Sequence, residues 1–174
     1  MGEEVWYATI VGVIVLSGLS IFYILYLAKM RRTKTNAAWK QAATELGLDF
    51  TPVTRIFGKY RMSGVIGKQL SCSVWAYTEP NGQGGYTTFM NYDVRFPQRL
   101  NKVKELLTPN IQSKLLEVNN VLKKVVVSDD SINSTRVSGF IRKSEILVQN
   151  VKLLIQLAEL IIPNEEVDSI FKEI

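Results

Sequence analysis

Histidine is absent from the chain, and cysteine occurs only once, at Cys72. Histidine is the commonest general base, the commonest metal ligand and the usual switch near neutral pH, so its absence removes the most frequent form of each. A single cysteine excludes an intramolecular disulfide and any cysteine-rich zinc site. We therefore expect no metal and no cofactor, and the composition favours a protein that is not an enzyme.

Charge is absent from one long segment, the 24 residues from Val5 to Ala28. As a helix this segment is about 36 Å long, enough to cross a hydrocarbon core of about 30 Å. A cleaved signal peptide begins with basic residues, whereas the first charges here are Glu3 and Glu4. We predict a transmembrane helix over residues 5–28, with aromatic side chains at the two membrane interfaces: Trp6, Tyr7, Tyr23 and Tyr26.

Cations cluster directly after this segment, at Lys29, Arg31, Arg32 and Lys34. Because flanking cations stay on the cytoplasmic side, residues 1–4 are predicted to lie outside and the C-terminal domain in the cytoplasm. The same cations are expected to contact anionic headgroups, at about 1 kcal/mol each, so residues 5–34 should bind membrane lipid. Residues 1–34 carry four cations and two anions, which leaves +3 of the formal net charge of +5 for the domain. That surplus is too small to predict a nucleic-acid partner.

The rest of the chain reads as a linking segment and one domain. Residues 29–47 are predicted to form a basic juxtamembrane segment and a helix that Gly47 ends, and residues 48–174 a cytoplasmic domain. No breaker lies between Ala28 and Leu46, so the anchor can continue into this helix. Strands are expected over 59–65, 69–78 and 86–96, and the last two form a hairpin around the glycine-rich turn 80–85. Residues 121–127 and 132–137 predict a second hairpin.

Two helices follow from pattern and capping. Thr108 and Pro109 are typical of an N-cap and a first helical position. Residues 142–162 have a narrow polar stripe within about 80° of arc, so this helix should be covered on most sides, and Asn150 on its apolar side needs a hydrogen-bond partner. Another short helix is expected over 164–174. The predicted fold class is α+β: a transmembrane helix, then one small domain with an antiparallel sheet of two hairpins packed on a long C-terminal helix.

Three patterns that resemble chemical sites fit structural roles better. The glycines between Gly82 and Gly85 precede a strand rather than a helix, which favours a turn over a phosphate cradle. Cys72 alternates with apolar residues, as a small buried hydrophobe does. Asp129 and Asp130 supply too few ligands for calcium and suit a turn. A serine–lysine catalytic pair stays open, because both residue types are common in the chain.

One candidate ligand or partner face remains. Trp75 and Tyr77 in one strand, with Tyr86, Tyr92 and Arg95 in the next, can present aromatic rings beside cations. Stacking on such a face binds ligands or single strands. The same alternation also describes an ordinary half-buried sheet, which is the simpler interpretation.

The apolar N-terminus, the helix end from Ala37 to Leu48, the strand from Gly58 to Gly64 and the segment beginning at Gly139-Phe140 carry a resemblance. The chain resembles small single-pass membrane proteins of prokaryotes with a cytoplasmic α+β domain. The resemblance implies an anchor in a prokaryotic plasma membrane and no particular activity, so no functional residue is carried over. Two hypotheses follow: a non-catalytic accessory or scaffold module that binds a protein partner or a second copy, or a ligand- or lipid-binding sensor or unusual hydrolase.

Overall fold

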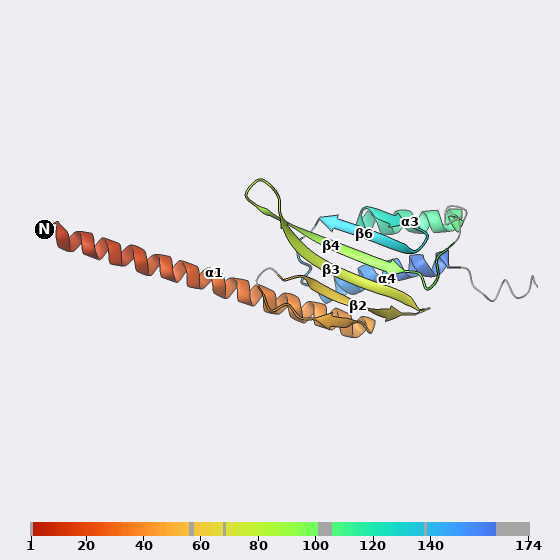
Figure 1. The fold of residues 1–174 in the computed structure, drawn as a ribbon, viewed down its shortest axis with the longest axis horizontal. Coiled ribbons are helices and arrows are strands. Elements are labelled where there is room, and N and C mark those ends of the chain that lie inside the picture. The colour runs from red at the N-terminus through yellow and green to blue at the C-terminus, as the bar shows by residue number, and fades with distance from the viewer. Residues whose placement is uncertain (1, 56–57, 68, 101–105, 138, 163–174) are drawn as a thin grey trace, which may run out of the picture. The chain divides into compact units, whose positions relative to one another are not determined.

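The computed structural model describes residues 2–55, 58–67, 69–100, 106–137 and 139–162 (Figure 1). The helix predicted over 164–174 lies outside these residues. The chain divides into two compact units, Met1–Lys34 and Thr35–Ile174. Its helices are α1 (Glu3–Leu46), α3 (Pro109–Leu122) and α4 (Ser144–Ile161), and its strands are β1 (Asp49–Thr51), β2 (Tyr60–Ile66), β3 (Leu70–Pro80), β4 (Tyr86–Arg95), β5 (Val125–Val127) and β6 (Ser131–Val137).

The first unit is the N-terminal part of α1, and most of its described apolar side chains are exposed. Ile14 is 65% exposed and Phe22 70% exposed, where a soluble fold would bury such groups. Within the described residues, one helix is long and apolar enough to cross a membrane, and it begins near the N-terminus. All four aromatic side chains predicted at the interfaces are exposed here, and so are Lys29, Arg31 and Lys34, whereas Arg32 is half-buried.

The last three turns of α1 belong to the second unit, and α1 runs to them without interruption. Trp39 is fully buried in the core, and its indole Nε1 donates a hydrogen bond to the carbonyl of Ile141 at 3.2 Å. Gly47 ends the helix as predicted: its φ of 68° lets the N–H of Leu48 reach the carbonyl of Ala43 at 2.8 Å.

The strands form one antiparallel sheet of six, in the order β1-β2-β3-β4-β6-β5. The described residues therefore form an α+β fold, with three helices and an antiparallel sheet. Strand β3 is central: it pairs with β2, which places Arg61 opposite Trp75, and with β4, which places Ser71 opposite Arg95. The glycine-rich turn connects β3 to β4, and the carboxamide Oδ1 of Asn81 accepts hydrogen bonds from the N–H groups of Gln83 and Gly85.

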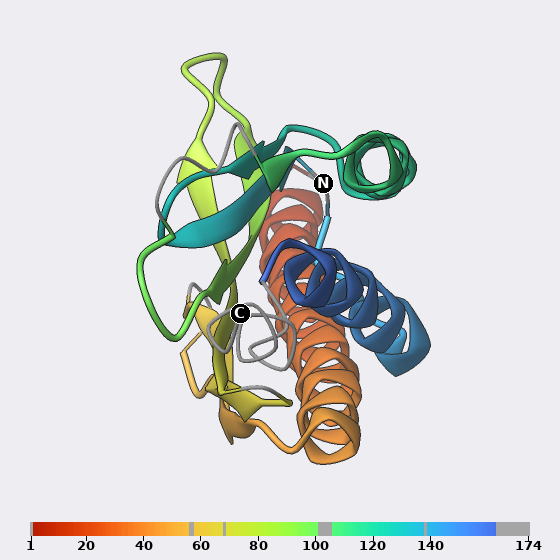
Figure 2. The same ribbon diagram turned by 90° about the vertical axis from the view of Figure 1, so that its right-hand side faces the viewer.

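Helices cover one face of this sheet. Figure 2 shows α3 and α4 on the same side, and within the described residues of the second unit no helix covers the strands on the other side. Two strand residues, Met62 and Val94, are fully buried on the covered face together with Leu154 of α4. Asn150 is 2% exposed and donates to the phenolic oxygen of Tyr92 at 2.9 Å, so the predicted partner exists.

The structure differs from the sequence expectations in two places. Residues 49–51 form β1, an edge strand that is not among the strands expected from the sequence. Val121 and Leu122 belong to α3, so the strand predicted from residue 121 is limited to Val125–Val127. Val121 is β-branched, but Leu122 is fully buried in the core, and its burial outweighs the local preference for a strand.

Candidate functional site

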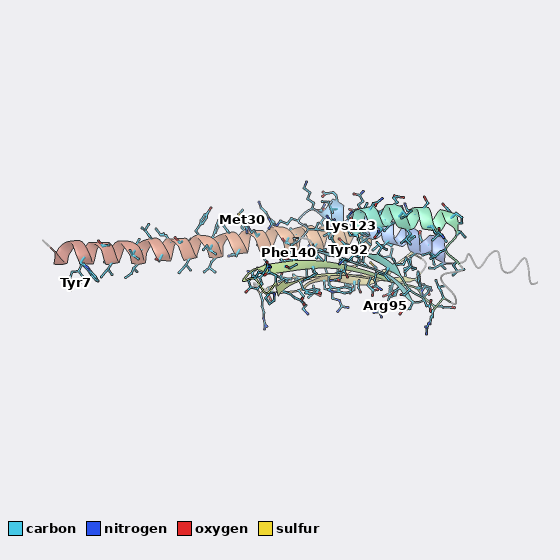
Figure 3. The ribbon with its side chains drawn as sticks, turned by 90° about the horizontal axis from the view of Figure 1, so that it is seen from above. Tyr7, Met30, Tyr92, Arg95, Lys123 and Phe140 are labelled. Carbon is cyan, nitrogen blue, oxygen red and sulfur yellow. The ribbon has the colours of Figure 1, made fainter. Side chains whose placement is uncertain are left out.

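The uncovered face of the sheet, which we call the open face, collects the alternate side chains of β2, β3 and β4. In β3 these are Ser71, Ser73, Trp75 and Tyr77, whereas Leu70, Cys72, Val74 and Ala76 point into the core and are at most 1% exposed. Figure 3 shows the two sides directly: Tyr92 lies on the helix side of the sheet and Arg95 on the other.

A hollow of about 510 Å³ lies on the open face. It is lined by Lys59, Arg61, Ser71, Ser73, Trp75, Asp93 and Arg95. Three of these residues are cations and Asp93 is the one carboxylate among them. Two further acids share this face by register but lie outside the lining: Asp49 on the edge strand β1 and Glu79 near the end of β3.

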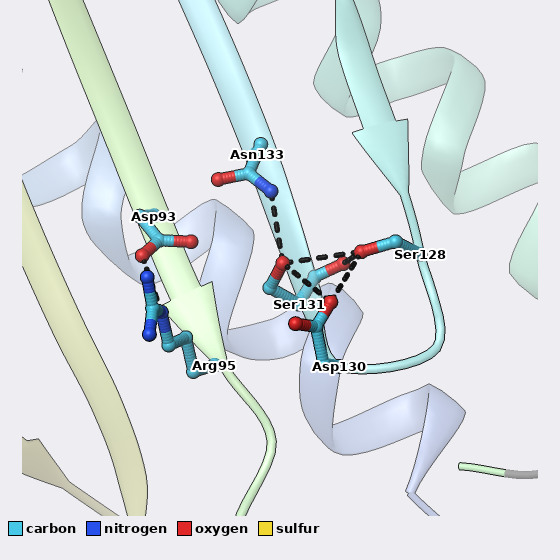
Figure 4. Close-up of polar contacts among 6 residues, drawn as sticks. All are labelled: Asp93, Arg95, Ser128, Asp130, Ser131 and Asn133. Carbon is cyan, nitrogen blue, oxygen red and sulfur yellow. Dashed lines mark hydrogen bonds and ion pairs between the residues drawn. The ribbon is translucent and has the colours of Figure 1, made fainter. Parts of the chain in front are cut away.

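Asp93 is held in an ion pair within the hollow. Its Oδ2 accepts a hydrogen bond from Nε of Arg95 at 2.9 Å (Figure 4). The Asp93 side chain is 9% exposed and the Arg95 side chain 66% exposed, so the guanidinium still reaches solvent. The hydrogen bond and the charge of Asp93 raise the pKa of Arg95 above its ordinary value. Arg95 is therefore a fixed cation whose remaining N–H groups can bind an anion.

The other cations are positioned differently. The ammonium of Lys59 lies 5.7 Å from the ring centroid of Tyr77. The ring of Phe89 also stacks on Tyr77, with the two ring centroids 5.4 Å apart. Arg61 is exposed, and its side chain forms no hydrogen bond or ion pair within the part of the chain that the structure describes. Its guanidinium is thus the most available cation of the hollow.

The hydroxyls of Ser71 and Ser73 are equally available. Neither forms a hydrogen bond to any residue of the described ranges, so both can donate to a ligand. A further donor lies in the row of Trp75: Asn91 is 8% exposed, its Oδ1 accepts from the hydroxyl of Thr135 at 2.8 Å, and its Nδ2 has no partner among the described residues. The open face therefore has an excess of hydrogen-bond donors over acceptors.

The polar side chains of a turn next to the hollow form hydrogen bonds with one another. The hydroxyls of Ser128 and Ser131 donate to Oδ1 of Asp130 at 2.8 and 3.2 Å, and Asn133 donates to the Ser131 hydroxyl at 2.8 Å (Figure 4). These two hydroxyls hold the pKa of Asp130 below its usual value. Asp129 makes a contact of 3.4 Å with Arg99. Both aspartates lie in this turn, as the sequence predicts, and the side chain of Asp130 is bonded to the turn's own hydroxyls.

The structure brings together three of the five residues named for a ligand or partner face. Trp75, Tyr77 and Arg95 share the open face. Tyr92 is 1% exposed on the core side, and Tyr86 is 66% exposed near the glycine-rich turn, on the same side of β4 as Tyr92 by alternation. Burial raises the pKa of Tyr92 to about 12.

Cys72 lies in the core, as predicted. It is 1% exposed, and burial, followed by the charge of Asp93, raises the pKa of its thiol to about 12. The thiol is therefore protonated and inaccessible at neutral pH, which is the opposite of what a nucleophile requires.

Five lining residues of the hollow are not among the site residues named from the sequence: Lys59, Arg61, Ser71, Ser73 and Asp93. Ser71 and Ser73 alternate along β3 with Trp75, so the sequence pattern places them on the same face as Trp75. Lys59 and Asp93 meet them only through the registers of the sheet, which the sequence does not contain.

No protein-family model, curated protein or solved structure matches the chain.

Proposed function

We propose that this chain is a non-catalytic module that is anchored to the cytoplasmic face of a membrane and binds a protein partner through the open face. The observation that carries the proposal is the hollow, which combines three cations, an accessible indole and unpaired donors on a sheet face that no described helix of the second unit covers. A stable fold rarely leaves such a surface unless it is used, since aromatic and arginine side chains are enriched where proteins bind each other.

The anchor supports the membrane part of the proposal. Exposed apolar side chains along the first unit have a favourable environment only in lipid or against another apolar surface. Lys29, Arg31 and Lys34 follow the apolar segment and are exposed, and such cations favour the cytoplasmic side. The plasma membrane of a prokaryote remains the expected location.

The contents of the hollow favour binding over catalysis. Its carboxylate is committed to Arg95, and the two serine hydroxyls have no general base within hydrogen-bond distance among the described residues. A ligand-binding sensor is the second candidate, because about 510 Å³ is within the range of small-molecule sites. Such sites are mostly apolar, however, and the lining here has only Trp75 as a large apolar surface.

Co-purification from native membranes tests the proposal. A face variant carries Lys59→Gln, Arg61→Gln and Arg95→Gln. A control variant carries Lys40→Gln, Arg142→Gln and Lys143→Gln, three exposed cations elsewhere, so both lose the same charge. We expect the full-length protein and the control variant to elute from mild detergent with the same partner in fixed proportion, and the face variant to elute without it. Equal partner recovery with both variants, or a wild-type protein that elutes alone at monomer size, contradicts the proposal.

A further inference from the structure

The charges of the hollow are not balanced within the protein. Of its three cations, only Arg95 has an acidic partner in the lining, and that partner, Asp93, is nearly buried. Arg61 has no partner within the described ranges, and Lys59 contacts only the face of an aromatic ring. A ligand that brings carboxylates would gain charge-assisted hydrogen bonds here, whereas a second copy of the same face would bring cations against cations.

The hydrogen-bonding groups have the same preference. The hydroxyls of Ser71 and Ser73 are unpaired, and the guanidinium of Arg61 offers a fork of donors. The one strong acceptor, Asp93, already accepts from Arg95 at 2.9 Å. The occupant that satisfies this set must therefore be rich in acceptors, as a carboxylate is.

The spacing of the cations indicates an extended occupant. Lys59 and Arg61 are two residues apart on one face, which is about 7 Å in an extended chain and equals the spacing of alternate side chains in a bound strand. Arg61 lies opposite Trp75 and Arg95 opposite Ser71. Those two levels of β3 are four residues apart, or about 13 Å. A single small anion does not span this length, but an extended peptide does.

We propose that the open face binds an extended acidic segment of a protein partner, whose carboxylates at alternate positions meet Lys59, Arg61 and Arg95. This inference rests on the proposed function and names the chemistry of the partner. The indole of Trp75, between the cations, contacts the segment's intervening atoms. Single-stranded nucleic acid fits less well, because it requires several free aromatic faces, and the ring of Tyr77 is covered by Phe89 and Lys59.

Peptide binding to the full-length protein in phosphatidylcholine nanodiscs tests the inference. The probe is a synthetic peptide in which glutamate alternates with threonine, and the matched peptide has glutamine at each glutamate. Binding is followed by the indole N–H signal of Trp75 in NMR, which reports on the hollow and is insensitive to binding at Lys29–Lys34. The face variant and the control variant defined above are measured in parallel.

The expected result is a saturable shift of the Trp75 signal with the glutamate peptide and loss of at least about tenfold in affinity in the face variant, as for charge-assisted pairs. The control variant should change by less than about twofold, because exposed cations elsewhere contribute only screening. The glutamine peptide should bind at least about tenfold more weakly than the glutamate peptide.

Three results overturn the inference. They are a glutamate peptide that leaves the Trp75 signal unchanged, equal affinity in the face and control variants, or stronger displacement by oligothymidylate or phosphatidylglycerol vesicles than by the glutamate peptide. The last result assigns the hollow to a nucleic acid or a lipid. If the co-purifying partner depends on the face cations but the glutamate peptide does not bind, the proposed function stands and only the acidic segment is excluded.

Discussion

The two faces of the sheet are built from the same strands but differ in every property that side chains confer. On the covered face, Val74 and Met90 are fully buried against helices. On the open face, Arg61 is exposed, Trp75 is half-buried, and the serine hydroxyls are unpaired within the described residues. Because burial of apolar surface supplies most of the folding free energy, the covered face determines stability. The open face contributes little to it and is free to bind.

The sharpest contrast is between Trp39, which is fully buried, and Trp75, which is half-buried on the open face. Trp39→Ala removes a fully buried ring that packs at 5.5 Å from Tyr60, and it leaves the carbonyl of Ile141 without its donor. We expect a loss of about 3–5 kcal/mol in the free energy of unfolding. Trp75→Ala should cost less than about 1 kcal/mol, because its ring is partly solvated, yet it should weaken partner binding. Urea denaturation followed by circular dichroism measures both; equal costs would remove the distinction between the faces.

Alkaline pH should destabilise the domain through the core thiol. The ordinary pKa of a cysteine thiol is 9.0, and burial raises the pKa of Cys72 to about 12 in the folded protein. The unfolded chain therefore releases a proton that the folded chain keeps, and stability falls as the pH rises from about 9 to about 12. At pH 11 we expect Cys72 to account for about 3 kcal/mol of this loss.

The test compares the wild-type protein with Cys72→Ala at pH 7 and pH 11. The variant is less stable at pH 7 because of its cavity, but the difference between the two proteins should narrow at pH 11. The two proteins share every other titratable group, so the narrowing isolates the thiol. A constant difference across this range would mean that Cys72 is not buried as the structure shows.

Loss of the buried hydrogen bond between Asn150 and Tyr92 should have an intermediate effect on the free energy of unfolding. Tyr92→Phe removes the acceptor of the Asn150 side chain and leaves a buried carboxamide unpaired. The expected cost is about 1–2 kcal/mol at pH 7. Arg95→Gln, on the opposite side of the same strand, should cost less than about 1 kcal/mol, because its partner Asp93 gains water access. Thermal unfolding of both variants in the same detergent compares their losses of stability. An equal loss for the two variants would contradict the expectation that the buried hydrogen bond matters more.

The smallest effect is expected at an exposed ion pair. Lys152 of α4 and Glu45 of α1 make a contact of 3.0 Å, and both side chains are about half exposed. Lys152→Ala should change the free energy of unfolding by less than about 0.5 kcal/mol, and salt should reduce this further. A larger loss in urea denaturation would show that surface charge, as well as the covered face, supports the fold.

Local rules predicted much of this fold correctly. Thr108 caps α3, with its hydroxyl accepting from the N–H of Ile111 at 3.4 Å, and Gly47 ends α1 with a positive φ. Asn150 has the partner that its position on an apolar helix face requires. Each of these features depends on a few neighbouring residues, so the sequence contains the whole signal.

The site was less predictable because it depends on register. Alternation correctly groups Trp75 with Tyr77, but it does not say which set of alternate residues in β4 lies on the same face as these two. The pairing of Trp75 with Asn91 turns Tyr92 into the core and Arg95 outward. Lys59 and Arg61 reach the hollow only because β2 lies beside β3 in this register. Non-local pairing of this kind leaves no mark on one strand read alone.

Photo-crosslinking in intact membranes tests the central claim that the open face is the binding face. A benzophenone side chain is placed at Ser73 on the open face, or at the exposed Gln112 of α3 or Gln156 of α4 on the helix side. We predict that the protein substituted at Ser73 forms a discrete crosslinked product with a partner and that the other two do not. Crosslinking to the same partner from Gln112 or Gln156, with none from Ser73, would place the binding surface on the helices and contradict this account.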